Sequence, residues 1–181
     1  MTLLELMGVR DRESSKPYET TPYDTWSSTE WGWEFRTDSG KRYAIMIDLP
    51  SSPGSYKPIS NNLLEVVFAL VTGSQVGDSG GQTTEIVPTG SITEAARIFS
   101  TVLAVCRKVN QKQKPLVWMF SAEEPSRKKL YQKLVNSLAP QLGAQVKIMH
   151  DEGIEYYFLV KPGEEAQKIV SKVAKAYELK K

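Results

Sequence analysis

The sequence has little cysteine, little histidine and no long apolar run. Cys106 is the one cysteine among 181 residues, and His150 is the one histidine. A disulfide within the chain is therefore excluded, and a zinc site built from thiolates and imidazoles has too few ligands. No run approaches 18 apolar residues, so we expect no transmembrane helix. The first six residues include Glu5 and lack a long apolar core, so we do not expect a signal peptide.

A strong charge of either sign is also lacking. The formal net charge is +2, which is smaller than the concentrated basic surface of most nucleic-acid-binding proteins requires. Hydrophobic residues make up 40% of the chain and charged residues 24%, the proportions of an ordinary globular domain. With a single cysteine, this composition suits a reducing compartment. We therefore expect a cytoplasmic protein with no membrane partner.

The organisation of the chain predicts one α+β domain. Residues 1–30 are rich in turn formers and are expected to form a loosely ordered N-terminal arm, and residues 31–181 are expected to form the domain. Period-2 alternation predicts a hairpin from Trp31 to Ile47 with its turn at Asp38–Gly40. Further strands are predicted at 63–71, 83–87, 115–120, 145–149 and 155–160.

Three helices are predicted between and after these strands. Capping-box spacing at Ser91–Glu94 indicates a helix that continues to about Val109, and the same spacing at Ser121–Glu124 indicates a second helix. Pro140 and Gly143 are expected to close the second helix, and a third is expected from about Glu164. The resulting order predicts a mixed, mostly antiparallel sheet flanked by helices.

The segment Gly77–Gly81 reads GDSGG, which matches a serine-protease nucleophile motif. Ser79 would need a histidine as its base, and the sole histidine follows the serine, whereas the chymotrypsin order places it before. A nucleophile elbow must instead open into a helix, yet the next residues, 82–87, are typical of a strand. We therefore reject a serine-hydrolase function and interpret the segment as a turn.

The remaining single residues suggest weak sites. His150, beside two acidic residues, could bind a metal or act as a base, but no second histidine completes a site, so we expect no metal. Cys106 lies on the apolar side of its predicted helix and is expected to be a core thiol. Arg127 lies near a predicted helix N-terminus, where it could bind an anion or a partner, or could pair with Glu123 or Glu124.

The segment Phe120–Tyr131, with the preceding helix segment Ala96–Val102, resembles a group of short uncharacterised proteins of tailed bacteriophages. Those proteins share an N-terminal aromatic hairpin like that of Trp31–Ile47, and the resemblance covers roughly residues 28–160. It implies a viral protein acting in the host cytoplasm, and it implies no particular activity.

The order strand, helix, strand, helix, hairpin is also similar to the C-terminal half of GNAT-type N-acetyltransferases. In that family a glycine-rich turn at a helix N-terminus holds the pyrophosphate of acetyl-CoA. The resemblance places this turn at Thr89, Gly90, Ser91, Ile92 and Thr93. It makes Tyr131 the residue that would protonate the departing thiolate. This chain keeps Gly90 but lacks the second glycine and the arginine or glutamine of the family turn.

Three functions remain open from the sequence. The leading hypothesis is a phage-type accessory protein with an acetyltransferase-like fold, catalytically degenerate, which binds another macromolecule and most simply a protein. The alternative is an active N-acetyltransferase that uses acetyl-CoA. The third is nucleic-acid binding through the lysines of the C-terminal helix, which would weaken steeply as salt concentration rises.

Overall fold

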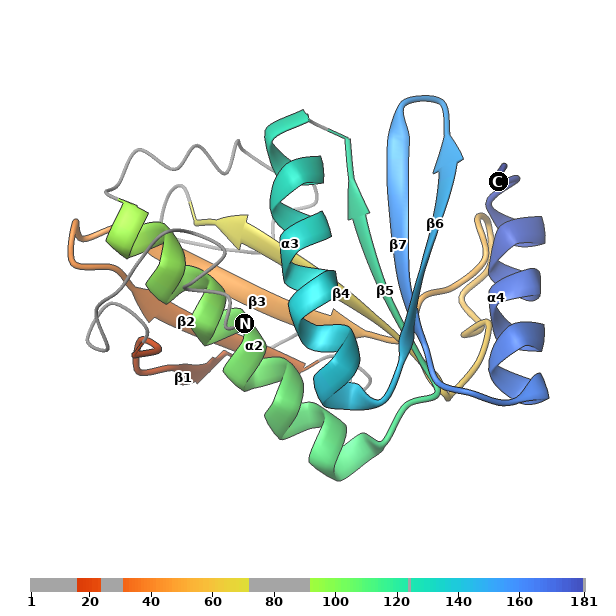
Figure 1. The fold of residues 1–181 in the computed structure, drawn as a ribbon, viewed down its shortest axis with the longest axis horizontal. Coiled ribbons are helices and arrows are strands. Elements are labelled where there is room, and N and C mark those ends of the chain that lie inside the picture. Colours follow the sequence, from red (N-terminus) through yellow and green to blue (C-terminus); the bar gives the residue numbers. More distant parts are fainter. Residues whose placement is uncertain (1–15, 24–30, 72–91, 124, 181) are drawn as a thin grey trace. The chain divides into compact units, whose positions relative to one another are not determined.

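The computed structural model describes residues 16–23, 31–71, 92–123 and 125–180 (Figure 1). Within these ranges seven strands pair in the order β1-β2-β3-β4-β5-β7-β6. The chain divides into two compact units. Unit 1 comprises Met1–Met46 and Val67–Cys106, and unit 2 comprises Ile47–Val66 and Arg107–Lys181. None of the helices in the described ranges combines the length and the apolar character needed to cross a membrane.

Unit 1 is built on a hairpin that the alternation predicted. Its elements are β1 (Thr21–Tyr23), β2 (Trp31–Arg36), most of β3 (Arg42–Asp48), the second half of β4 (Leu63–Leu70) and the first part of α2 (Ile92–Gln113). The amide of Thr37 donates to the carbonyl of Lys41 at 2.9 Å and closes the β2–β3 turn. Gly40 in this turn has φ 82°, a conformation that favours glycine.

A stack of aromatic rings forms the core of unit 1. The ring of Phe35 lies 5.6 Å from those of Tyr18 and Tyr43, and the ring of Phe68 lies 5.1 Å from that of Tyr43, centroid to centroid. The guanidinium of Arg97 covers the Tyr18 ring at 3.9 Å, a cation–π contact. Residues far apart in the sequence are thus packed together by the alternate side chains of neighbouring strands.

Part of the predicted N-terminal arm is ordered. β1 pairs antiparallel with β2, and Tyr18 is 7% exposed. The amide of Tyr18 donates to the Thr101 hydroxyl of α2 at 2.8 Å. β1 can add to a sheet edge because Pro22, at an edge position, needs no N–H donor. Residues 1–15 and 24–30 lie outside the described residues.

A second contact with α2 involves the turn between β2 and β3. The carboxylate of Glu94 accepts hydrogen bonds from the amide of Ser39 at 3.3 Å and from its hydroxyl at 2.5 Å. Burial acts to raise the pKa of Glu94, but these bonds and one from Thr37 lower it below its ordinary value. The ionised carboxylate therefore ties the turn to the first helical turn of α2 within unit 1.

Unit 2 contains the strand–helix–strand sequence predicted for the second half of the chain. Its elements are the chain Ile47–Val66, β5 (Val117–Ala122), α3 (Pro125–Leu142), β6 (Gln145–Asp151), β7 (Ile154–Val160) and α4 (Glu164–Ala176). β4 and β5 run parallel, whereas β5 with β7 and β6 with β7 are antiparallel. The predicted α+β class, with a mixed and mostly antiparallel sheet flanked by helices, is confirmed.

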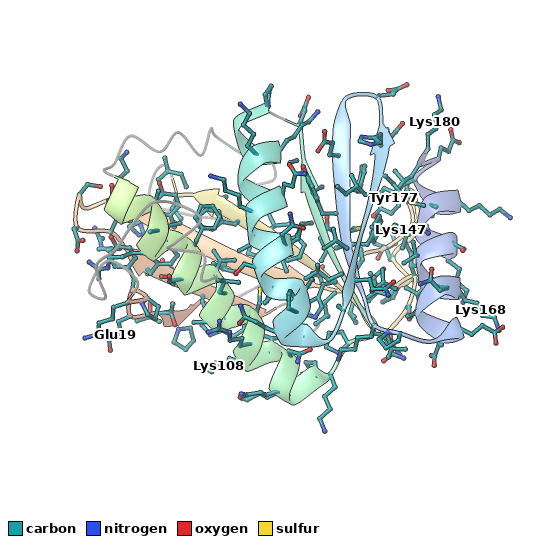
Figure 2. All side chains as sticks on the ribbon, in the orientation of Figure 1. Glu19, Lys108, Lys147, Lys168, Tyr177 and Lys180 are labelled. Atoms are coloured by element: carbon teal, nitrogen blue, oxygen red, sulfur yellow. The ribbon has the colours of Figure 1, made fainter. Side chains whose placement is uncertain are left out.

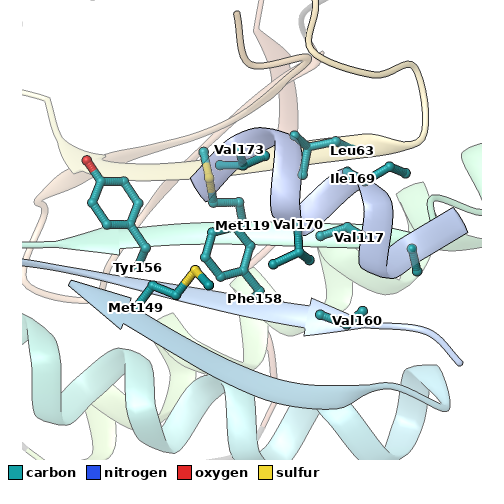
Figure 3. Packing of buried hydrophobic residues seen from close by; sticks show 11 residues of the cluster. Leu63, Val117, Met119, Met149, Tyr156, Phe158, Val160, Ile169, Val170 and Val173 are labelled. Atoms are coloured by element: carbon teal, nitrogen blue, oxygen red, sulfur yellow. The ribbon is translucent and has the colours of Figure 1, made fainter. Parts of the chain in front are cut away.

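The two faces of the β5–β7–β6 sheet are covered by different helices. α3 packs against β5, β6 and β7, and α4 packs against β5 and β7. Alternate strand residues meet α4 in a buried apolar cluster (Figure 3). Each fully buried side chain of this kind contributes about 1.5–3 kcal/mol to the stability of the fold. The cluster consists of Leu63, Val117, Met119, Met149, Tyr156, Phe158, Val160, Ala166, Ile169, Val170 and Val173.

The predicted start of the second helix was wrong. Ser121 and Ala122 belong to β5, where they pair with Tyr156 and Glu155 of β7, and α3 begins at Pro125. The backbone groups of Ser121 are thus satisfied by the sheet rather than by a helix cap. A proline at the first helical position costs no hydrogen bond, since that N–H has no partner within the helix.

The β6–β7 hairpin is tighter than predicted. His150 and Asp151 lie within β6, and the turn consists of Glu152 and Gly153, both with positive φ. A two-residue turn of this kind matches the twist of the flanking strands. Lys128 of α3 donates to the carbonyl of Gly153 at 2.6 Å, so the first turn of α3 is tied to the hairpin.

Candidate acid–base site

Glu65 is the charged residue in the apolar strand β4. It lies in register with Met119 of β5 and two residues after Leu63, which belongs to the cluster beneath α4. Side chains two residues apart share a face of a strand. The Glu65 carboxyl group therefore lies on the α4 face of unit 2, at the edge of an apolar cluster and only partly exposed to solvent.

Burial and a neighbouring acid shift the ionisation of Glu65. Burial raises its pKa, and the negative charge of Asp48, the last residue of β3, raises it further, to about 7. Asp48 also accepts a hydrogen bond from the amide of Leu49 at 2.6 Å. Two acids of unit 2 thus lie close together, and one of them titrates near neutral pH.

Two tyrosines complete the surroundings of Glu65. Tyr156 of β7 is 7% exposed, and its ring centroid lies 5.9 Å from that of Tyr177, the C-cap residue of α4. Burial, then the charges of Asp151 and Glu65, raise the pKa of Tyr156. Burial, then Glu65 and Tyr156, raise the pKa of Tyr177 to about 12. Both phenols therefore stay protonated at neutral pH and can donate hydrogen bonds.

This arrangement can transfer protons. A general base is most effective when its pKa lies near the working pH, because it is then often ionised and still holds a proton well. Glu65, with a pKa of about 7, meets this condition, whereas an ordinary glutamate does not. Strongly shifted acids of this kind cluster at functional sites. We call Asp48, Glu65, Tyr156 and Tyr177 the acid–tyrosine cluster.

The structure places Tyr131 away from the acid–tyrosine cluster. Its ring is 4% exposed and packs against Phe120 at 6.0 Å and Tyr157 at 6.4 Å, centroid to centroid. Phe120 and Tyr157 alternate with the residues that face α4, so Tyr131 lies on the opposite, α3 face of the sheet. Tyr131 and Glu65 therefore do not form one constellation.

The other predicted site residues fall in three groups. Thr89, Gly90 and Ser91 lie outside the described residues, as does the GDSGG segment. Ile92 and Thr93 form the first helical positions of α2, and Arg127 lies in the first turn of α3; for these three residues only the backbone is described.

Two further residues have defined surroundings. Cys106 is 0% exposed, which confirms the predicted core thiol. His150 is exposed, and its amide and carbonyl pair with Lys180 at 2.8 Å each. Among the residues that can be described, no three acidic, histidine or cysteine side chains come together as metal ligands.

The sequence prediction missed all four residues of the acid–tyrosine cluster. A signal was present for Glu65, because it interrupts an apolar run that otherwise extends from Leu63 to Val71. Asp48 ends a strand, Tyr156 lies within a strand and Tyr177 ends a helix, and none of these positions is unusual. Their proximity follows from the order of strands and helices and from no local pattern.

Comparison with known proteins gives little further information. No protein-family model matches the chain, and no curated protein matches it. Among solved structures, the chain is similar to a mutant of spermidine N-acetyltransferase SpeG from Vibrio cholerae, with 6% sequence identity and a TM-score of 0.39. The match covers 94% of each chain. At this TM-score the likeness carries no weight for the fold or the activity of the chain.

Proposed function

We propose that the protein is an N-acyltransferase in which Glu65 is the general base. The observation that supports this is the near-neutral pKa of Glu65, about 7, on the sheet face that α4 covers, with Asp48, Tyr156 and Tyr177 close enough to interact with its charge. An amine nucleophile is mostly protonated at neutral pH and must lose a proton before it can attack a carbonyl carbon. In keeping with the sequence resemblance, the acyl donor in this proposal is acetyl-CoA.

The proposed reaction assigns one proton transfer to the chain. A proton passes from the nitrogen of the amine to a Glu65 carboxylate oxygen, and the nitrogen forms a bond to the acyl carbon. The carbon–sulfur bond breaks, the nitrogen releases its second proton as the amide forms, and the departing thiolate takes up one proton from solvent. Glu65 then returns its own proton to solvent. Tyr131 lies on the opposite face of the sheet and has no part in this proposal. The sequence resemblance gave it the role of protonating the thiolate, and in this proposal solvent takes that role.

Thiol release tests the proposal directly. The full chain is incubated with acetyl-CoA and a panel of primary amines, and free thiol is followed with a thiol-reactive dye between pH 5.5 and pH 9. We expect a rate that rises with pH to a plateau, with a midpoint near 7. Glu65→Gln should lower the rate by about 10²- to 10⁴-fold.

A matched control separates the base from a general charge effect. Glu152→Gln removes a carboxylate of the same chemistry from the exposed hairpin turn, and it should leave the rate unchanged. Tyr131→Phe should also keep the midpoint of the pH profile. Equal rates for the wild type and the Glu65→Gln variant would remove Glu65 from the reaction.

The second candidate is a catalytically inactive, phage-type accessory protein that binds another protein. The burial of Tyr131, which is 4% exposed, favours this function because the expected general acid then has no access to a substrate. Calorimetric titration with acetyl-CoA distinguishes the candidates. Absence of both heat and turnover would support the accessory protein, whereas micromolar binding with turnover would support the enzyme.

A further inference from the structure

We propose that Tyr177 is a positioning residue for Glu65, which fixes the chain before β4 and keeps water from the Glu65 carboxyl group. The inference deepens the proposed function, and it rests on that function only for the statement that Glu65 acts as a base. The contacts that carry it all lie within unit 2. They join the end of α4 to the chain between β3 and β4.

A hydrogen bond fixes the chain before β4. The hydroxyl of Tyr177 donates to the carbonyl of Ser51 at 2.9 Å. Ser51 forms an antiparallel bridge with Pro58, and the amide of Ile59 donates to the carbonyl of Pro50 at 2.9 Å. The segment from 50 to 59 is therefore a closed loop, held at its base and tied by one phenol to the end of α4.

The ring of Tyr177 packs on the sheet face that also carries Glu65. It packs against the buried cluster that contains Leu63, Met119 and Tyr156. Leu63 precedes Glu65 by two residues and Met119 is its register partner on β5, so the cluster that the ring covers includes two neighbours of Glu65. Because Tyr177 and Tyr156 are both perturbed by the charge of Glu65, the three groups share one poorly hydrated region.

The residues after Tyr177 hold it in place. Glu178 has a positive φ of 54° and turns the chain, and the amide of Leu179 donates to the carbonyl of Ala174 at 2.8 Å. Lys180 then exchanges two hydrogen bonds with His150 of β6. Figure 2 marks Tyr177 and Lys180 at this end of α4. The phenol is thus fixed from both sides, by α4 and by the edge strand of the sheet.

The charged and titratable groups around Glu65 come from four elements. They are Asp48 at the end of β3, Tyr156 on β7, Tyr177 after α4, and Asp151 and Lys147 on β6. The two β6 residues lie on the α4 face by their register with β7. Tyr177 differs from the others because its hydroxyl group is hydrogen-bonded to the 50–59 loop, at the carbonyl of Ser51. Removing its ring should admit water without removing a formal charge.

The test follows the ionisation of Glu65 in the full chain without substrate. Glutamate labelled with ¹³C at the carboxyl carbon is observed by NMR, and the Glu65 signal is assigned by its loss in Glu65→Gln. The wild-type midpoint should lie near 7. In Tyr177→Ala we expect it to fall by about one pH unit, because added hydration favours the charged form. An unchanged midpoint in the folded variant would overturn the inference.

Two further variants separate the ring from the hydroxyl group. Tyr177→Phe keeps the ring, so the midpoint should stay near 7 while amide exchange at Ile59 accelerates about five- to tenfold. Tyr56→Phe removes the hydroxyl of a fully exposed loop tyrosine and should change neither measurement. Where Tyr177→Ala does not fold, unchanged exchange at Ile59 in Tyr177→Phe would overturn the inference. If Tyr177→Ala shifts the Glu65 midpoint while the wild type releases no thiol, the role of Tyr177 is supported and the acyltransferase proposal is refuted.

Discussion

Replacing Glu65 by glutamine should make the protein more stable at pH 8 than the wild type, and equally stable near pH 4.5. The folded state raises the pKa of Glu65 from 4.5 to about 7. Between these values the folded state holds a proton that the unfolded state has released. The stability associated with Glu65 is therefore full below pH 4.5 and is lost as the pH rises through 7.

The size of the effect follows from the same shift. One pKa unit corresponds to 1.36 kcal/mol, so a rise from 4.5 to about 7 amounts to at most about 3 kcal/mol. Glu65 is partly exposed to solvent, which makes this an upper limit. Glutamine has nearly the same shape and no charge, so its contribution to the free energy of unfolding should not depend on pH.

Urea denaturation at pH 5, 6, 7 and 8 measures the difference. The free energy of unfolding of the wild type should fall with pH relative to that of Glu65→Gln, by about 2–3 kcal/mol over the range. Amide exchange at Phe158, in the core of unit 2, reports the same quantity where the two units unfold separately. Parallel pH curves for the two proteins would refute the reasoning, and Glu152→Gln should remain parallel to the wild type.

Three further substitutions test contacts of the fold by urea denaturation. Thr101→Val removes the acceptor of the buried Tyr18 amide and should cost about 1–3 kcal/mol, which Thr101→Ser restores. Lys128→Met loses the hydrogen bond to Gly153 and should cost about 1 kcal/mol. Burial acts to raise the pKa of Glu94, but donated hydrogen bonds lower it, so the stability it provides is lost as the pH falls below its ordinary value. Glu94→Gln should therefore flatten the acid limb of the stability curve below about pH 4.5.

The sequence predicted the elements well where one period dominated. Alternation correctly indicated β2 and β3, and the buried residues Phe35, Tyr43 and Ile45 lie on the predicted positions. The helix predicted from about Glu164 is also confirmed as α4, whose buried side includes Ile169 and Val173. In these segments one face is buried and the other is solvated, so the pattern of side chains reports the structure directly.

The predicted start of the second helix was wrong because a local cap signal competed with strand pairing. Ser121 has the spacing of a helix cap, yet the antiparallel ladder with β7 continues through Ser121 and Ala122. The ladder satisfies the backbone groups of both residues, and Pro125 then starts the helix without the loss of a hydrogen bond. A cap signal read from the sequence cannot include a ladder partner more than thirty residues further along the chain, so the outcome depends on tertiary structure.

The candidate site was hidden for a different reason. A lone glutamate in an apolar strand is compatible with an exposed edge position or with a perturbed carboxyl group, and local sequence does not separate these. The topology decides, because it places Asp48 one strand away and closes the α4 face with Tyr156 and Tyr177. An acid whose neighbours are another acid, one buried phenol and one half-buried phenol has little water to stabilise its charge. The property that makes Glu65 a candidate base is therefore produced by the assembled fold.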